Sequence, residues 1–348
     1  MSFVPLYPTA REVLQNGGVF VRSPLALDAR KQHHEGYQRL LTLYYILSGA
    51  RAVIPGAHTG EFALNDLELL DRWMLWIKQM TAQYGKKMVL MAMIGGKEVR
   101  KQVDLALKHQ YHAVMIAPTA FQGLSENEVI SLFEAIAQDI PIFAFELQRA
   151  IPGSYPYTPE LWSRIFNIAF GAKGASFDTY RSLVMLEAAA KSDRKNDLTL
   201  FTGNDDRIVE DLLGDYQFGT KTVHYQGGLL GHFATDTQAA VKWFEAIQSY
   251  RQYGEWHFSL SKKQLAHGVN RCNMALFDAI GNFENSVWGV KYRLFSQGLL
   301  PGPYCMHESG RPGQDKAIDE IYQEYPALND DQYLQDNLAD LKQEVGIR

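Results

Sequence analysis

The sequence contains only two cysteines among its 348 residues, Cys272 and Cys305. Two cysteines cannot build a disulfide framework, and these two do not show metal-ligand spacing. No apolar run approaches the length needed to span a membrane, and the first residues (Met-Ser-Phe-Val-Pro) lack a basic segment followed by an apolar core. We therefore expect a cytoplasmic protein with no membrane partner.

An excess of charge of one sign is also missing. The chain carries 34 lysines and arginines against 39 aspartates and glutamates, for a formal net charge of -5 at pH 7. This balance gives no reason to expect nucleic acid as a partner. Nucleotide-binding motifs are absent too, because no Gly-x-Gly-x-x-Gly turn follows the first predicted strand and no Walker-type Gly-Lys-Ser/Thr occurs. Their absence weakens the doubly wound sheet as a fold.

What the sequence does contain is a regular alternation of short apolar runs with longer amphipathic ones. The runs predict strands at residues 18–22, 52–55, 88–93, 113–117, 142–145, 169–173, 198–202 and 220–224. The amphipathic stretches predict helices at 30–48, 65–83, 97–110, 125–137, 158–167, 178–192, 205–214 and 235–252. Eight strand–helix pairs in a row predict a (β/α)8 TIM barrel over residues 1–252, with the doubly wound sheet as the alternative.

After residue 253 only helical patterns follow, at roughly 260–280, 283–298 and 315–343. Residues 253–348 are therefore predicted to form a C-terminal helical region packed on the barrel or on a neighbouring subunit.

Lys173 is the first candidate for chemistry, because it ends the sixth predicted strand and is followed by small residues and by Asp178, a helix cap. Active sites of TIM barrels lie at the carboxyl ends of the strands. A lysine buried there loses its proton readily, and only the neutral amine attacks a carbonyl. A solvated loop lysine is the alternative reading of this residue alone.

Other strand ends carry polar residues as well. The turn after the second strand contains His58, Thr59 and Gly60, and its backbone N–H groups with the threonine hydroxyl would suit a carboxylate, although a plain turn explains it too. After the fifth strand come Glu146 and Arg149, which could simply pair with each other. Alternatively, Arg149 binds a substrate carboxylate and Glu146 transfers a proton.

Two further candidates end the last two predicted strands. Asp205 lies in a turn where it caps a helix or hydrogen-bonds substrate hydroxyls. His224 is either an acid/base at the mouth of the barrel or a buried core residue.

Four motifs, in order, resemble the dihydrodipicolinate synthase / N-acetylneuraminate lyase family of Schiff-base barrel enzymes. Residues 57–61 are similar to the family's Gly-Thr/Ser-Thr-Gly-Glu loop, and residues 173–178 to its Lys-x-Ala/Ser-Ser-x-Asp motif. Residues 203–205 match Gly-Asp/Asn-Asp, and the segment 287–299 is similar to the family's Pro-x-Lys segment ending in Gly-Leu. The resemblance runs over nearly the whole chain.

The resemblance implies that Lys173 forms a Schiff base with a 2-oxo acid such as pyruvate or a 2-keto-3-deoxy sugar acid, whose carboxylate sits on Thr59 and Gly60. The resemblance also suggests a homotetramer or homodimer. We expect no cofactor and no metal. One departure matters: the family's proton-relaying tyrosine is replaced by Phe145, which has no proton to give. True dihydrodipicolinate synthase activity is therefore not expected.

Three functions follow from this reading. The first is a class I aldolase or hydro-lyase in which Glu146, His58 or His224 replaces the tyrosine, with Asp205 contacting the substrate. The second is a barrel that has lost its chemistry and now binds a 2-oxo acid or regulates. The third is a metal-dependent lyase using these scattered acids and histidines, which no local ligand spacing supports.

Overall fold

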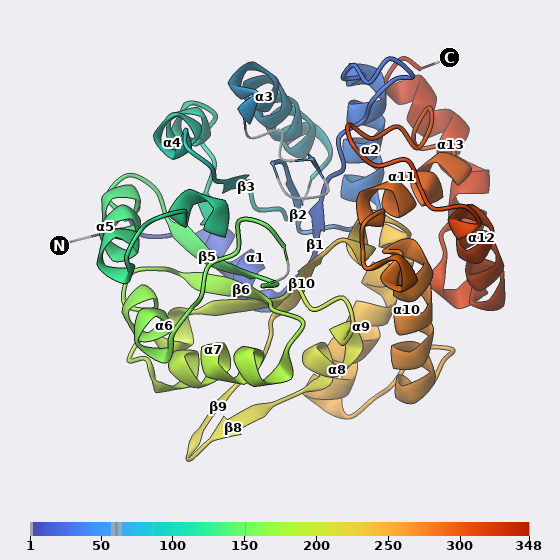
Figure 1. Ribbon diagram of the computed structural model, residues 1–348. Coiled ribbons are helices and arrows are strands. Elements are labelled where there is room, and N and C mark those ends of the chain that lie inside the picture. The colour runs from blue at the N-terminus through green and yellow to red at the C-terminus, as the bar shows by residue number, and fades with distance from the viewer. Residues whose placement is uncertain (1–2, 57–59, 62–64, 86, 150, 348) are drawn as a thin grey trace.

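Eight parallel strands form a nearly closed barrel in the computed structural model, which describes residues 3–56, 60–61, 65–85, 87–149 and 151–347 (Figure 1). The strands follow one another around the sheet in the order β2-β1-β10-β7-β6-β5-β4-β3. They are β1 (Gly18–Arg22), β2 (Ala52–Ile54), β3 (Met91–Ile94), β4 (Ala113–Ile116), β5 (Ile142–Leu147), β6 (Gly171–Ala175), β7 (Thr199–Thr202) and β10 (Gly227–Leu230).

Two backbone hydrogen bonds join the remaining edges. The N–H of Val89 donates to the carbonyl of Arg51 at 2.8 Å, and the N–H of Met93 donates to that of Pro55 at 3.2 Å. Because these bonds link the segments that contain β2 and β3, the first and last strands of the sheet, the predicted (β/α)8 barrel with C-terminal helices is confirmed.

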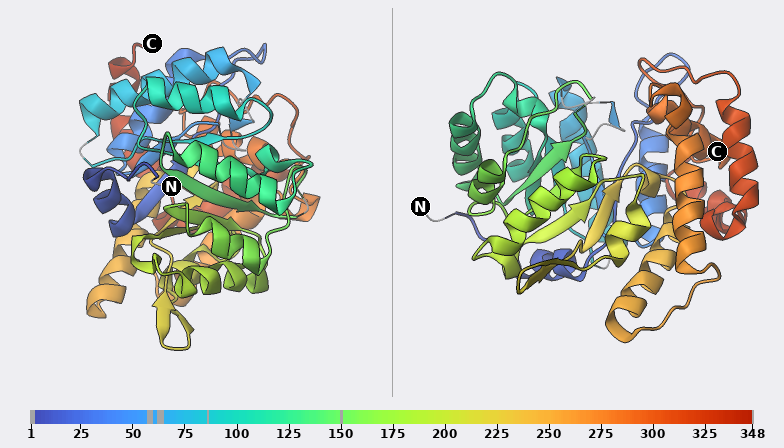
Figure 2. Two further views of the ribbon diagram at one scale, coloured as in Figure 1. Left: turned by 90° about the vertical axis from the view of Figure 1, so that its left-hand side faces the viewer. Right: turned by 60° about the horizontal axis from the view of Figure 1, so that its bottom comes forward.

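The eighth predicted strand, residues 220–224, is wrong. Those residues form β9 (Lys221–Val223), which pairs antiparallel with β8 (Tyr216–Phe218) in a hairpin that projects from the barrel (Figure 2). The eighth barrel strand is β10, which begins with two glycines that read as a turn in the sequence. A Cβ at Gly227 would lie 2.5 Å from the carbonyl oxygen of Gly18, so β10 can approach β1 this closely only without a side chain.

Alternate side chains of each strand face two different cores. One set fills the barrel interior and includes Phe20, Met93, Met115, Phe143 and Phe201. The other set faces the surrounding helices and continues into a larger apolar cluster. This period of two decides which strand residues can reach the centre of the barrel.

The barrel helices agree with the predicted ranges to within a few residues. They are α2 (Glu35–Leu47), α3 (Leu67–Tyr84), α4 (Val99–Lys108), α5 (Glu126–Ala137), α6 (Pro159–Ile165), α7 (Thr179–Lys191), α8 (Ile208–Leu213) and α9 (Thr237–Tyr253). A further helix, α1 (Pro8–Asn16), was not predicted. Its Ala10, Val13 and Leu14 join the interior core, so α1 closes the amino-terminal end of the barrel.

The C-terminal region contains α10 (Lys262–Leu276), α11 (Ser286–Ser296), α12 (Gln314–Glu324) and α13 (Asp331–Glu344). The helix predicted over 315–343 is two helices, because Pro326 starts a short 3-10 turn between them. α10 packs on α8 and α12, and α13 packs on α2 (Figure 1). None of the helices in the described ranges combines the length and the apolar character that a bilayer span requires.

Candidate active site

Lys173 lies at the centre of the site, on the inner face of β6. It pairs in register with Phe145 of β5, and its Nζ atom lies 4.1 Å from the centroid of the Phe145 ring. The side chain has no exposed surface, and Nζ has no hydrogen-bond partner among the described residues. The amine therefore lies inside the barrel, against the phenyl ring of Phe145.

This environment favours the neutral amine. Burial lowers the pKa of Lys173 well below its usual value, and the positive charge of Arg22 lowers it further, while Asp205 acts in the opposite direction. Because a neutral amine is the nucleophilic form, the pocket provides the condition that imine formation needs.

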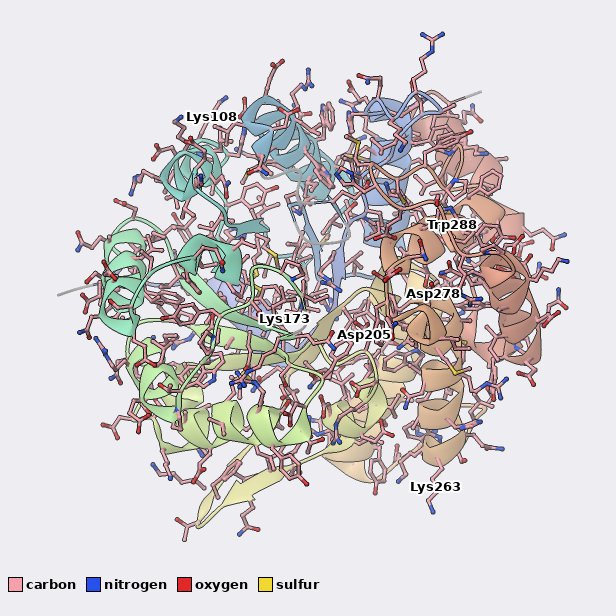
Figure 3. All side chains as sticks on the ribbon, in the orientation of Figure 1. Lys108, Lys173, Asp205, Lys263, Asp278 and Trp288 are labelled. Carbon is pink, nitrogen blue, oxygen red and sulfur yellow. The ribbon has the colours of Figure 1, made fainter. Side chains whose placement is uncertain are left out.

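Asp205 follows β7, and its carboxyl group interacts electrostatically with the amine of Lys173. Burial raises the pKa of Asp205 to about 6, against the opposing effect of Arg22 and Lys173. Its backbone carbonyl accepts a 2.6 Å hydrogen bond from Asn273 of α10, and the N–H of His232 donates to its Oδ1 at 3.4 Å. Figure 3 shows Asp205 between Lys173 and the C-terminal helices, which thus help to position it.

Arg22 is the charged residue that sequence analysis missed. It ends β1 on the same face as Phe20, which packs in the barrel interior, and only 8% of its surface is exposed. Burial lowers the pKa of Arg22, and Asp205 raises it. Its even spacing from Phe20 at a strand end was the available signal, because residues i and i+2 share a face.

A single pocket brings these three groups together. Besides Arg22, Lys173 and Asp205, it is lined by Phe145, Leu147, Gln148, Ile151, Ala175, Phe177, Gly203, Phe277, Phe283, Ser286 and Val287. The residues come from strand ends around the barrel and from the C-terminal region. The pocket therefore combines a guanidinium, an amine and one carboxyl group with a largely apolar wall.

Glu146 does not reach this pocket. It follows Phe145 in β5 and so points to the opposite face, toward the helices, where it forms an ion pair with Arg181 of α7. Burial raises the pKa of Glu146, and Arg181 lowers it. A carboxyl group on the outer face of the sheet has no path to the Lys173 amine.

Arg149 and His224 also lie elsewhere. Arg149 is exposed on the loop after β5, and its neighbours Leu147 and Gln148 line the pocket in its place. His224 precedes β10 and so lies at the amino-terminal end of the barrel, in a surface depression shared with Gln15 and Asn16 at the end of α1. Its predicted place at a strand's carboxyl end depended on the wrong eighth strand.

The predicted carboxylate turn is described only in part. His58 and Thr59 lie outside the described residues. A Cβ at Gly60 would lie 3.5 Å from the carbonyl oxygen of Ser23, so Gly60 lies beside the residue that follows Arg22 at the end of β1. Glu61 forms a buried ion pair with Lys291 of α11 and accepts a 2.5 Å hydrogen bond from the N–H of Met306, which ties this turn to the C-terminal region.

Gly203 makes room for the lysine. A Cβ there would lie 2.6 Å from the Cβ of Ala175 and would also overlap Cε of Lys173. We expect Gly203→Ala to lower the free energy of unfolding by about 1–3 kcal/mol and to displace the amine. Rates of carbonyl adduct formation measured by mass spectrometry should fall at least about tenfold, equivalent to 1.4 kcal/mol.

The control is Gly123→Ala, where a Cβ meets nothing within 4 Å and only the left-handed backbone is strained. Equal adduct rates in both variants would contradict the close packing inferred around Lys173.

The fold matches that of solved structures from the family that the sequence motifs resemble. No protein-family model matches the chain. Among solved structures, dihydrodipicolinate synthase from Acinetobacter baumannii, complexed with pyruvate, has a TM-score of 0.71 at 15% identity, covering 88% of this chain and 98% of that one. The synthase from Bacteroides thetaiotaomicron has a TM-score of 0.69 at 17% identity, covering 88% of this chain and 98% of that one. N-acetylneuraminate lyase from Mycoplasma synoviae has a TM-score of 0.67 at 16% identity, covering 89% of this chain and 98% of that one.

These likenesses establish a shared fold over most of each chain.

Within the part of the chain that the structure describes, no group of three or more histidine, cysteine, aspartate or glutamate side chains is placed to hold a metal ion. The oligomeric state, the cytoplasmic location and the division at residue 252 stay predictions.

Proposed function

We propose that the protein is a class I lyase that forms an imine between Lys173 and a 2-oxo acid. The observation that carries the proposal is the buried amine of Lys173, which has no hydrogen-bond partner among the described residues, in a pocket that also holds Arg22 and Asp205. Burial favours the nucleophilic form of the lysine. The fold shared with pyruvate-binding and sialic acid-cleaving barrels is consistent with this chemistry.

Arg22 is the residue we assign to the substrate carboxylate. A guanidinium binds a carboxylate through two parallel hydrogen bonds, and a buried one does so with little competition from water. The turn that includes Thr59 and Gly60 was proposed for the same carboxylate, and Gly60 lies beside Ser23, the neighbour of Arg22. Both assignments therefore place the carboxylate near the end of β1.

Asp205 is the group we assign to proton transfer in place of the missing phenol. The Lys173 amine adds to the 2-oxo carbon and water leaves, giving an imine. In the cleavage direction Asp205 takes the proton of the C4 hydroxyl, the C3–C4 bond breaks, and its electron pair moves into the protonated imine to give an enamine. The enamine recovers a proton at C3, and water then releases the lysine.

Phe145 favours a second candidate, a barrel that binds a 2-oxo acid without turning it over. The phenyl ring of Phe145 lies against Nζ of Lys173, at the position where the family that the sequence resembles has a tyrosine phenol. A protein of this kind would still bind its ligand on Arg22 but would lack sustained turnover.

Reduction of the imine tests the proposal. The protein is incubated with pyruvate and borohydride, and its intact mass is measured against samples given either reagent alone. The lyase proposal predicts a mass increase of one reduced pyruvate per chain, seen only when both reagents are present. Pyruvate binding without any adduct would favour the binding protein.

Replacing Arg22 by glutamine should weaken the recognition of the carboxylate. We expect the pyruvate concentration for half-maximal adduct to rise about 10- to 100-fold, because a hydrogen-bonded charged partner contributes about 1.5–3 kcal/mol. Methyl pyruvate, which lacks the charge, should be much less affected.

Arg149→Gln is the matched control, since Arg149 is the exposed arginine that sequence analysis favoured. If Arg149→Gln weakens pyruvate and Arg22→Gln does not, the assignment of the carboxylate to Arg22 is wrong.

A further inference from the structure

Apart from Arg22, Lys173 and Asp205, the lining of the pocket is largely hydrocarbon. The large side chains without polar atoms in this lining, called the apolar wall below, are Phe145, Leu147, Ile151, Phe177, Phe277, Phe283 and Val287. The uncharged polar side chains among the described lining residues are Gln148 and Ser286. Two such groups are few for a ligand with several hydroxyls.

Two of the phenylalanines are held in a backbone conformation that bulky residues rarely adopt. Phe177 has φ of 52° and Phe283 has φ of 64°, both in the left-handed region. Their rings meet edge to face, with centroids 6.1 Å apart, although the two residues come from distant segments of the chain. Such strain persists only where surrounding contacts fix it, and it is concentrated at functional sites.

The contacts that fix Phe177 and Phe283 are visible. The N–H of Phe177 donates to Oδ1 of the buried Asn204 at 3.0 Å. The N–H of Phe283 donates to the carbonyl of Asp278 at 3.0 Å, and Oδ1 of the buried Asp278 pairs with Nε of Arg311 at 2.8 Å. These bonds hold the backbone from which both side chains reach the pocket lining.

An apolar wall of this kind selects its ligand by desolvation. A hydroxyl group moved from water to a place without a hydrogen-bond partner costs about 1–3 kcal/mol. Burial of an aromatic ring is favourable at roughly 25 cal/mol per Å² of apolar surface. A chain of several hydroxyls is therefore disfavoured here, whereas a phenyl-sized group is favoured.

We infer that the part of the substrate beyond C3 is an apolar, aromatic group rather than a hydroxylated sugar chain. The inference rests on the proposed imine chemistry at Lys173 and names the substrate class of that site. A representative substrate is 4-hydroxy-2-oxo-4-phenylbutanoate. Its C3–C4 bond breaks, the C4 hydroxyl becomes the carbonyl of benzaldehyde, and the proton lost from that hydroxyl is balanced by the one gained at C3 of pyruvate.

The test compares kcat/KM for this compound with that for a six-carbon 2-keto-3-deoxy sugar acid. We expect a preference of at least about 100-fold for the phenyl compound, equivalent to roughly 3 kcal/mol. Equal cleavage of the two, or faster cleavage of the sugar acid, overturns the inference. Cleavage of neither, with a pyruvate adduct on Lys173, overturns it while the imine chemistry stands; absence of any adduct removes the proposed function itself.

A variant pair checks the wall directly. Phe283→Ser should lower kcat/KM for the phenyl compound at least about tenfold, or 1.4 kcal/mol, because the variant replaces an aromatic ring of the pocket lining by a hydroxyl group. Ile280→Ser is the control, since Ile280 belongs to the same segment but is 75% exposed. Equal effects of the two variants on the phenyl compound overturn the role of Phe283.

Discussion

Replacing Lys173 by methionine is expected to abolish the adduct with pyruvate and to lower turnover at least about 10⁴-fold, because no other group can supply the covalent intermediate. Methionine keeps the length of the side chain and its contact with Phe145, so the pocket should retain its shape. The readouts are intact mass after borohydride reduction and the initial rate of pyruvate release.

The same variant should be more stable than the wild type at pH 7. Burial holds the pKa of Lys173 in the folded protein below the 10.5 of the unfolded chain, so the unfolded state binds more protons between the two values. Stability of the wild type therefore rises with pH over this interval. The advantage of Lys173→Met in melting temperature should therefore be larger at neutral pH than near pH 10, where the unfolded lysine also begins to lose its proton.

Lys263→Met is the control for both readouts, since Lys263 points into solvent from α10 (Figure 3). It should keep the adduct, the rate and the melting temperature. A loss of activity in Lys173→Met accompanied by unfolding would leave the role of the amine unsupported, whereas loss with increased stability separates chemistry from folding.

Asp205→Asn is expected to lower turnover about 10²- to 10⁴-fold, the usual contribution of a general acid–base group. The asparagine has nearly the same shape and keeps the backbone hydrogen bond to Asn273. Imine formation should persist in this variant, because the amine of Lys173 is still present. Single-turnover trapping and steady-state rates, measured side by side, distinguish the two steps.

The role of Asp205 as a base predicts how kcat/KM depends on pH. Asp205 acts as a base only when ionised, and burial raises its pKa to about 6. In the wild type kcat/KM, which reports the free enzyme, should therefore fall as the pH drops below about 6. Asp205→Asn should lack this acidic limb, and Asp206→Asn, at the exposed neighbouring residue, should keep it. An unchanged limb in Asp205→Asn would contradict the assignment.

The barrel was predictable because its strands and helices repeat with clear periods. Seven of the eight strand positions follow from apolar runs, and caps such as Ser125 and Asp178 occupy the helix starts that the sequence indicates. The eighth strand was misplaced because Gly227 and Gly228 serve close packing of strands, a tertiary requirement that looks like a turn locally.

The site was less predictable than the fold. Lys173 could be found because its surroundings form a local motif. Glu146 could not be excluded by composition, since one residue of register separates the barrel interior from the helix-facing surface. Arg22 gave only one signal in the sequence, its place at a strand end two residues after Phe20, because Lys173 and Asp205 lie far away in the chain and approach it only when the barrel closes.

Peptide mapping of the protein reduced by borohydride in the presence of pyruvate tests the central claim most directly. The claim predicts one modified residue, Lys173, and an unmodified Lys291, which is equally buried but whose amine is engaged in an ion pair with Glu61. Modification of Lys291 or of surface lysines, with Lys173 untouched, would contradict it.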